Sequence, residues 1–209
     1  MKGFGKLTNY EVDGQTVKLD FAGKKAQIKV LTPLIFNVFW SKDGSRTASK
    51  AIEGEKELPT EVEVEKEGEA LWIRTKDAAA RVSDGFFVDF FDRDGACVCE
   101  DYRGERKPLQ RISDEMRKLL IEEGHAAEAD AEAYAFEVIK SLNSSAHFYG
   151  LGDKTGFLDK RHYDYEMWNT DNPAPQVDCF KALYKSIPFF ITLTDSHVYG
   201  LFMDNTFKS

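Results

Sequence analysis

Short runs in which apolar and polar residues alternate recur through the first hundred residues of the chain, and turn residues separate them. In residues 16–21, Val17, Leu19 and Phe21 alternate with polar neighbours, and residues 27–31 continue the pattern. A two-residue period places successive side chains on opposite faces, so it predicts half-buried β-strands. Many short strands at this spacing indicate an antiparallel sandwich or barrel.

Dipeptides that favour tight turns mark the hairpins in this pattern. Asp13-Gly14 precedes the first alternating run, Glu67-Gly68 interrupts a second, and Asp94-Gly95 interrupts a third. Glycine reaches the positive φ that two-residue hairpin turns require, which is why these dipeptides predict hairpins. Pro33 ends one run, and the apolar density of residues 34–40 predicts a strand buried on both faces.

Residues 105–132 depart from the strand pattern because they are rich in charged residues and alanine. Ser113 is the predicted N-cap of a helix, since acidic residues follow it in the first turn, where they complement the helix dipole. Gly124 is the predicted residue just past the helix end. The predicted fold is therefore all-β, an antiparallel β-sandwich with a short helical insertion at about 105–132.

Composition and charge narrow the range of partners. Hydrophobic residues make up 42% of the chain and charged residues 31%, as in ordinary globular domains. The net charge of -8 repels phosphate backbones, so no nucleic-acid partner is expected. No apolar run approaches the length of a membrane span, so no membrane partner is expected either. The first residues lack the apolar core of a signal peptide, which predicts a cytoplasmic protein.

The cysteines and histidines favour neither a disulfide nor a metal site. Cys97 and Cys99 would share one face of a strand, where neighbouring residues are poorly placed for a disulfide, and Cys179 leaves the count odd. We interpret all three as reduced thiols, in keeping with a cytosolic protein. The four histidines are scattered rather than set at ligand spacing, so neither a metal nor another cofactor is expected.

Residues 147–175 form the longest stretch without a clear strand period, and they are rich in glycine, proline and aromatic residues. Irregular segments of this length are uncommon in compact domains and are often functional. Two further strands are predicted after it, in residues 183–195 and 197–206. The Gly150-x-Gly152 pattern lacks the rest of a phosphate-binding loop, and glycines at positive φ where a strand ends explain it better.

Four motifs, taken in order and spacing, resemble the N-terminal domain of glycoside hydrolase family 31. They are residues 148–154, 167–171, 184–190 and 199–206. The resemblance implies that residues 1–209 are a galactose-mutarotase-like β-sandwich from a retaining α-glucosidase, an enzyme that removes terminal α-linked glucose from oligosaccharides. It also implies a partner within the same protein, a catalytic (β/α)₈ barrel expected after residue 209.

In this family the catalytic aspartates lie on barrel loops, about 5–5.5 Å apart as retention of configuration requires. The family's nucleophile run, Trp-x-Asp-Met-x-Glu, is absent from this sequence. The resemblance therefore implies that the chain contributes no catalytic residue and is inactive alone. Because the maltose-like α-1,4, isomaltose-like α-1,6 and α-xyloside classes of substrate all occur in the family, the linkage stays open.

The resemblance further implies that a loop of this domain, at about 150–176, helps to shape the sugar pocket of the barrel. Asp171 matches the position whose carboxylate accepts hydrogen bonds from substrate hydroxyls. Asn169 and Thr170 would be supporting donors or loop braces, and Trp168 could offer its apolar face to a sugar ring. Without the resemblance, these residues would read as a turn beside a packed tryptophan.

A second hypothesis is a stand-alone carbohydrate-binding or mutarotase-like β-sandwich. A mutarotase-like enzyme needs a histidine general base and a carboxylate that face one groove. The spacing of the histidines suggests no such pair. The chain also ends at Ser209 directly after a strand pattern, which favours the first hypothesis.

Overall fold

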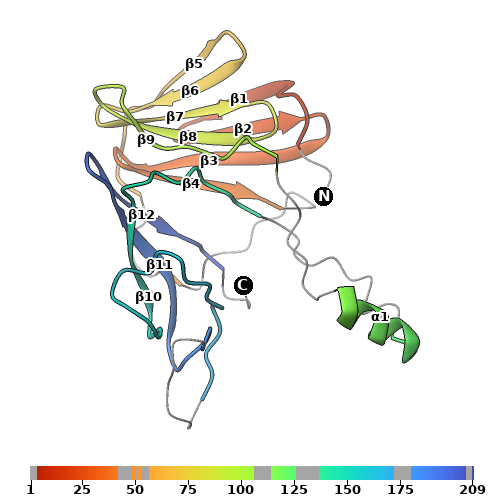
Figure 1. Cartoon of the computed structure of the whole chain (residues 1–209). Helices are drawn as coiled ribbons and strands as arrows, with labels where there is room; N and C mark the ends of the chain where they lie inside the picture. The colour runs from red at the N-terminus through yellow and green to blue at the C-terminus, as the bar shows by residue number, and fades with distance from the viewer. Residues whose placement is uncertain are drawn as a thin grey trace.

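The computed structural model describes residues 4–41, 49, 51–52, 57–105, 114–125, 137–171, 180–205 and 209. Within these residues the chain forms three antiparallel sheets and one helix (Figure 1). The predicted all-β class is confirmed, because strands account for nearly all of the regular structure.

The first sheet contains four strands that follow one another along the chain and in space. They are β1 (Asn9–Asp13), β2 (Thr16–Phe21), β3 (Lys24–Thr32) and β4 (Ile35–Trp40). The second sheet contains five, also in sequential order. They are β5 (Glu63–Glu67), β6 (Ala70–Arg74), β7 (Ala78–Ser83), β8 (Phe87–Asp92) and β9 (Cys97–Cys99). Simple hairpin connections account for both orders, as the turn dipeptides predict.

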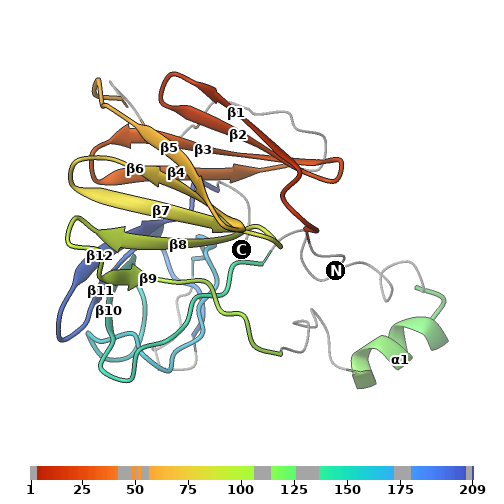
Figure 2. The same ribbon diagram turned by 90° about the horizontal axis from the view of Figure 1, so that it is seen from above.

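The inner faces of these two sheets form one shared hydrophobic core, and the sheets lie against each other in both views (Figures 1 and 2). The predicted alternation is confirmed in β2, where Val17, Leu19 and Phe21 are buried, and β6 buries Leu71 and Ile73 opposite them. We call this pair of sheets the sandwich. Each fully buried Leu, Ile, Val or Phe side chain contributes about 1.5–3 kcal/mol.

The third sheet lies beside the β9 end of the sandwich (Figure 1). It contains β10 (His147–Gly152), β11 (Ser186–Leu193) and β12 (Val198–Phe202), with β11 in the middle. The strands predicted in residues 183–195 and 197–206 are therefore confirmed. The irregular stretch predicted from residue 147 onward was wrong for residues 147–152, which pair with β11 as a strand.

The prediction that residues 34–40 form a strand buried on both faces was wrong. Within the described residues β4 pairs only with β3, at the edge of the first sheet. Ile35 is 53% exposed and Val38 39% exposed. A dense apolar run is compatible with a central strand or with an edge strand that faces another part of a protein, and hydrophobicity alone does not distinguish them.

The helical insertion is shorter in the described residues than the predicted range of 105–132. Helix α1 spans Asp114–Glu122 and lies apart from the sheets in both views (Figures 1 and 2). Ser113, the predicted N-cap, falls outside the described residues. Gly124 has a φ of 87° and ends the helix as predicted, because its amide donates to Ile121 O and the amide of His125 donates to Leu120 O.

Candidate functional site

The loop that contains the predicted sugar-contacting residues begins at a strained end of β10. Gly150, Leu151 and Gly152 have φ values of 132°, 72° and 82°. A Cβ on Gly150 would lie 2.7 Å from Phe189 O, and one on Gly152 would lie 2.5 Å from Lys185 O. Only glycine permits this approach to β11, which supports the reading of Gly150-x-Gly152 as the end of a strand.

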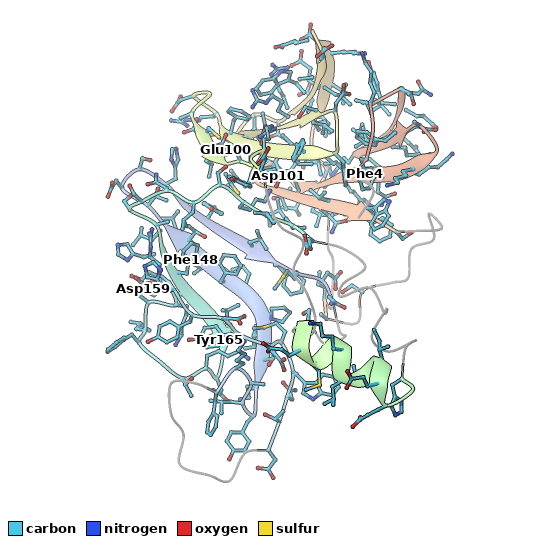
Figure 3. All side chains as sticks on the ribbon, turned by 45° about the vertical axis from the view of Figure 1, so that its right-hand side comes forward. Phe4, Glu100, Asp101, Phe148, Asp159 and Tyr165 are labelled. Carbon is cyan, nitrogen blue, oxygen red and sulfur yellow. The ribbon has the colours of Figure 1, made fainter. Side chains whose placement is uncertain are left out.

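Hydrogen bonds to its own backbone hold the first part of this loop in place. The Asp159 carboxylate accepts from the amides of Phe148, at 3.0 Å, and Arg161, at 3.1 Å, and contacts His147 Nδ1 at 2.6 Å. The Phe148 amide and then His147 lower the pKa of Asp159 to about 2. Figure 3 shows Asp159 near Phe148 of β10. This carboxylate fixes the loop to the strand that precedes it.

Lysine and tyrosine side chains complete the bracing. Lys160 Nζ donates to Phe157 O at 2.6 Å, and Tyr165 Oη donates to Thr155 O at 2.7 Å. These bonds brace residues 155–165, although Phe157 is 77% exposed and Leu158 78% exposed at the tip. An ordered loop can present side chains to a partner with little further loss of entropy on binding.

The four predicted sugar-contacting residues follow this braced part and lie beside the start of β11. Trp168 is 48% exposed, and its carbonyl accepts a hydrogen bond from Ser186 Oγ at 3.0 Å. Asn169 Oδ1 accepts from the Ser186 amide at 2.7 Å, and the Thr170 amide donates to Leu183 O at 2.9 Å. The two backbone groups and the Asn169 side chain therefore face the scaffold.

Asp171 is exposed and is the last residue described before residue 180. Within the described part of the chain its carboxylate makes no hydrogen bond or ion pair, whereas the Asn169 side chain is bonded to Ser186. The chain thus provides an exposed carboxylate and an exposed tryptophan within one short segment, which the scaffold holds by its backbone. Such a pair can accept hydrogen bonds from sugar hydroxyls and cover a sugar face.

Sequence reasoning missed Lys154 and Ser186 as parts of this site. Lys154 Nζ donates to Glu166 O at 2.8 Å and to Ser186 Oγ at 3.1 Å. Lys154 is half-buried, and this burial lowers its pKa. The available signal was a lysine two residues after the glycine pair at the end of β10, but its use requires knowing that β10 pairs with β11.

Sequence reasoning also missed two contacts between a histidine and an aspartate. His197 Nε2 lies 3.1 Å from Asp92 Oδ2, and His197 Nδ1 lies 2.8 Å from Ser196 Oγ. Both ring nitrogens of His197 are thus occupied, and this contact joins the β11–β12 turn to the sandwich. The pair of His147 and Asp159 anchors the loop.

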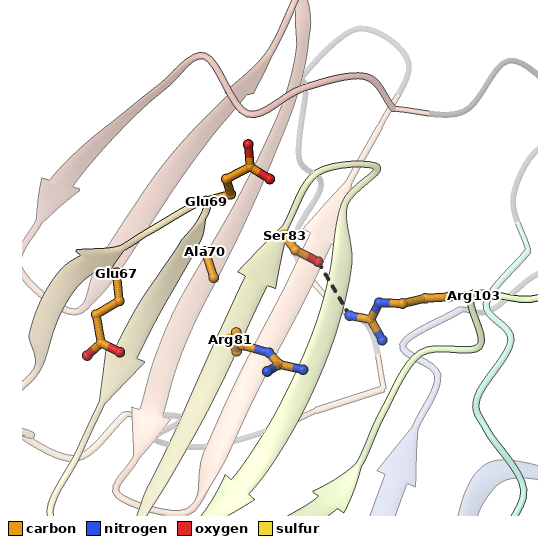
Figure 4. A pocket seen from close by; sticks show the side chains of 6 residues that line it. All are labelled: Glu67, Glu69, Ala70, Arg81, Ser83 and Arg103. Carbon is orange, nitrogen blue, oxygen red and sulfur yellow. Dashed lines mark hydrogen bonds between the residues drawn. The ribbon is translucent and has the colours of Figure 1, made fainter.

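The outer face of the second sheet has a shallow hollow of about 320 Å³ beside a charged cluster (Figure 4). Asp89 is fully buried there and accepts hydrogen bonds from Arg103, Arg81 and the Asp101 amide. Burial disfavours its charge, yet the bonds from Arg103 and Arg81 outweigh burial and lower the pKa of Asp89. This cluster clamps residues 101–103 onto β8.

The described ranges also bear on metal binding and on membrane insertion. They contain no group of three or more His, Cys, Asp or Glu side chains able to hold a metal ion. None of the helical residues they include forms a segment long and apolar enough to cross a membrane. Cys97 is exposed, Cys99 is buried, and both are free thiols, whereas Cys179 lies outside these ranges.

These features define a β-sandwich domain that carries a third sheet and a braced loop after β10. The family model described as the glycosyl hydrolase 31 N-terminal galactose mutarotase-like domain matches residues 25–209. The chain belongs to this family, as the motifs in its second half imply.

Two curated relatives are similar to parts of the chain. "Alpha-glucosidase 2" of Bacillus thermoamyloliquefaciens is 42% identical over 108 residues, which cover 50% of this chain and 14% of the relative. An alpha-glucosidase of Saccharolobus solfataricus is 38% identical over 71 residues, which cover 34% of this chain and 10% of the relative. The matched segments are therefore a small part of each relative.

Solved structures of family members share the fold. A glycoside hydrolase family 31 dextranase of Flavobacterium johnsoniae, solved as a mutant complexed with isomaltotriose, superposes with a TM-score of 0.76 at 28% identity. That match covers 100% of this chain and 23% of the dextranase chain. An alpha-xylosidase of Xanthomonas citri has a TM-score of 0.57 at 15% identity over 87% of this chain and 18% of its own, which shows likeness of fold only.

Proposed function

We propose that this chain is the non-catalytic N-terminal domain of a retaining α-glucosidase that removes terminal α-linked glucose from oligosaccharides. In this proposal the domain supports the catalytic barrel and contributes Asp171 to the sugar pocket. The observation that carries it is the segment 167–171, whose backbone the scaffold holds while Asp171 and Trp168 stay exposed. The similarity to two alpha-glucosidases supports the choice of glucose over other sugars.

The proposed surface for the barrel is one face of the third sheet. Alternate residues of β11 and β12 place large apolar side chains on it, each at least 40% exposed. They are Ile187, Phe189, Ile191, Leu193, Val198 and Phe202. We call this set the apolar face. Exposed apolar patches of this kind mark interaction surfaces. The barrel is its proposed occupant because the relatives extend several times beyond the matched segment.

The proposed location is the cytoplasm. It is supported by Cys97 and Cys99, which are free thiols. Burial raises the pKa of the Cys99 thiol, so this thiol stays protonated at neutral pH.

The test of the sugar contact is the substitution Asp171→Ala in the complete enzyme. Each hydrogen bond to a charged acceptor contributes about 1.5–3 kcal/mol, so kcat/KM on an α-glucoside should fall roughly ten- to a hundred-fold. Asp171→Asn should retain more activity if geometry matters more than charge. Steady-state kinetics and a melting curve measure both effects.

Asp195→Ala is the matched control, because Asp195 is an exposed aspartate in the β11–β12 turn. It should change neither kinetics nor Tm. Unchanged kinetics in Asp171→Ala would remove this residue from the sugar pocket. A large fall in Tm would instead assign it a structural role.

A further inference from the structure

We propose that Lys154 and Ser186 act as positioning residues, which together lock the segment 167–171 onto the start of β11. Lys154 holds the Ser186 hydroxyl, and Ser186 holds the segment that ends in Asp171. This inference rests on the proposed function for the role of Asp171, but the lock itself is a property of this chain.

The contacts form a continuous relay. Lys154 Nζ donates to Ser186 Oγ at 3.1 Å, so this hydroxyl accepts from the lysine. The same hydroxyl donates to Trp168 O at 3.0 Å, and the Ser186 amide donates to Asn169 Oδ1 at 2.7 Å. A hydroxyl that accepts from a cation becomes a stronger donor, because chains of hydrogen bonds polarise one another.

Lys154 also holds the segment from its other end. Its Nζ donates to Glu166 O at 2.8 Å, and the ammonium lies 5.9 Å from the centre of the Tyr165 ring. Thus the lysine contacts the chain directly before residue 167 and, through Ser186, the chain at Trp168. With the bond from the Thr170 amide to Leu183 O, the segment is fixed along its length up to Asp171.

The backbone that leads to Lys154 is strained at the end of β10. Leu151 has a φ of 72°, a left-handed conformation that a branched, bulky residue rarely adopts. The two glycines beside it bring the chain so close to β11 that Gly152 pairs with Ser186. This path brings Lys154 Nζ within hydrogen-bond distance of Glu166 O and Ser186 Oγ. Strained backbone conformations of this kind cluster at functional sites.

The first experiment measures the lock in this chain alone, by amide hydrogen exchange. In Lys154→Met the amides of Thr170 and Ser186 should exchange about ten-fold faster, since they lose the support of a charge-assisted hydrogen bond. Lys154→Arg should restore part of the protection, because a guanidinium retains the charge and the donors. Amides of β3 in the sandwich should not change.

Lys185→Met is the matched control, because Lys185 is an exposed lysine next to Ser186 in the sequence. It should leave all of these amides unchanged. If Lys154→Met fails to fold, Ser186→Ala removes the same relay with a smaller change and should give the same local result. Unchanged exchange at Thr170 and Ser186, or equal acceleration of the β3 amides, would overturn the proposal.

The second experiment uses the complete enzyme, with Asp171→Ala as the reference. Lys154→Met should raise KM about ten-fold with a smaller change in kcat, and Lys154→Arg should recover part of the loss. If Asp171→Ala lowers kcat/KM and Lys154→Met has no effect, the positioning role is wrong. If Asp171→Ala has no effect, Asp171 is not part of the sugar pocket, and the exchange experiment alone decides whether the lock exists.

Discussion

The sandwich and the third sheet are built from the same kind of strand but finish their packing differently. In the sandwich, both sheets turn their apolar faces inward, and Leu71, Ile73 and Val17 are fully buried. In the third sheet, one face lies toward β9, while the apolar face remains about half open, with Ile191 at 40% and Val198 at 65% exposure. The sandwich therefore completes its own core, and the third sheet presents a surface that a partner would complete.

The two regions also differ in what holds their irregular parts. In the sandwich, the fully buried Asp89 clamps residues 101–103 with two arginines. In the loop after β10, the more exposed Asp159 clamps the chain through the Phe148 and Arg161 amides. Both regions thus use a carboxylate to hold an irregular segment, but the carboxylate is buried in the sandwich and about one-third exposed in the loop.

The largest expected effect contrasts Leu71→Ala with Ile191→Ala in this chain. Loss of the fully buried Leu71 side chain should lower the free energy of unfolding by about 2–5 kcal/mol. Ile191→Ala should cost about 1 kcal/mol or less, because part of this side chain is already in water. Urea unfolding followed by circular dichroism measures both values.

In the complete enzyme, the difference between the stability costs of Leu71→Ala and Ile191→Ala should be smaller if the barrel covers the apolar face. Ile191→Ala should then approach the cost of a buried substitution, because the side chain would be buried in the interface. A cost of Ile191→Ala that is equal in the chain and in the complete enzyme would contradict this role of the apolar face.

The sandwich could be predicted from the sequence because its determinants are local. Alternation in β2 and the turn at Glu67-Gly68 specify strands and hairpins without knowledge of any distant contact. The burial of residues 34–40 could not be predicted, since it depends on which sheet edge β4 occupies. The strand at residues 147–152 was missed because its glycines, which read as a loop, are what allow β10 to approach β11.

The candidate site was predictable only in part. Asp171 and its neighbours were identified through a resemblance, because their own residue types fit a turn as well as a sugar contact. Lys154 and Ser186 were missed because they are 32 residues apart and meet only through the pairing of β10 with β11. Side-chain relays between distant segments leave no period in the sequence, whereas strands do.

A smaller effect is expected from Asp89→Ala, which tests the buried clamp. The substitution leaves Arg81 and Arg103 close together without their shared counter-charge. Because these side chains are 35% and 38% exposed, water relieves part of the repulsion. The free energy of unfolding should fall by about 2–3 kcal/mol.

Asp94→Ala is the control for the buried clamp, since the Asp94 side chain is 80% exposed in the β8–β9 turn. It should change stability by about 0.5 kcal/mol or less. Equal costs for Asp89→Ala and Asp94→Ala in urea unfolding would show that the cluster adds nothing to the sandwich.

The smallest effect, and the most selective one, is expected from Asp159→Asn, which tests the exposed clamp. The pKa of this carboxyl is about 2 in the folded chain against an ordinary value of 3.8. Because the folded value is lower, the carboxylate stabilises the fold fully above about pH 4, and this contribution is lost as the pH falls toward 2. Asp159→Asn should therefore lower Tm slightly at pH 6, and the difference from the unsubstituted chain should vanish near pH 2.

Asp195→Asn, in an exposed turn, should show no such pH dependence. A Tm difference that persists unchanged at pH 2, or a carboxyl of Asp159 that titrates near 3.8 by NMR, would mean that the loop is not held by this charge and that its order comes from packing, as in the sandwich.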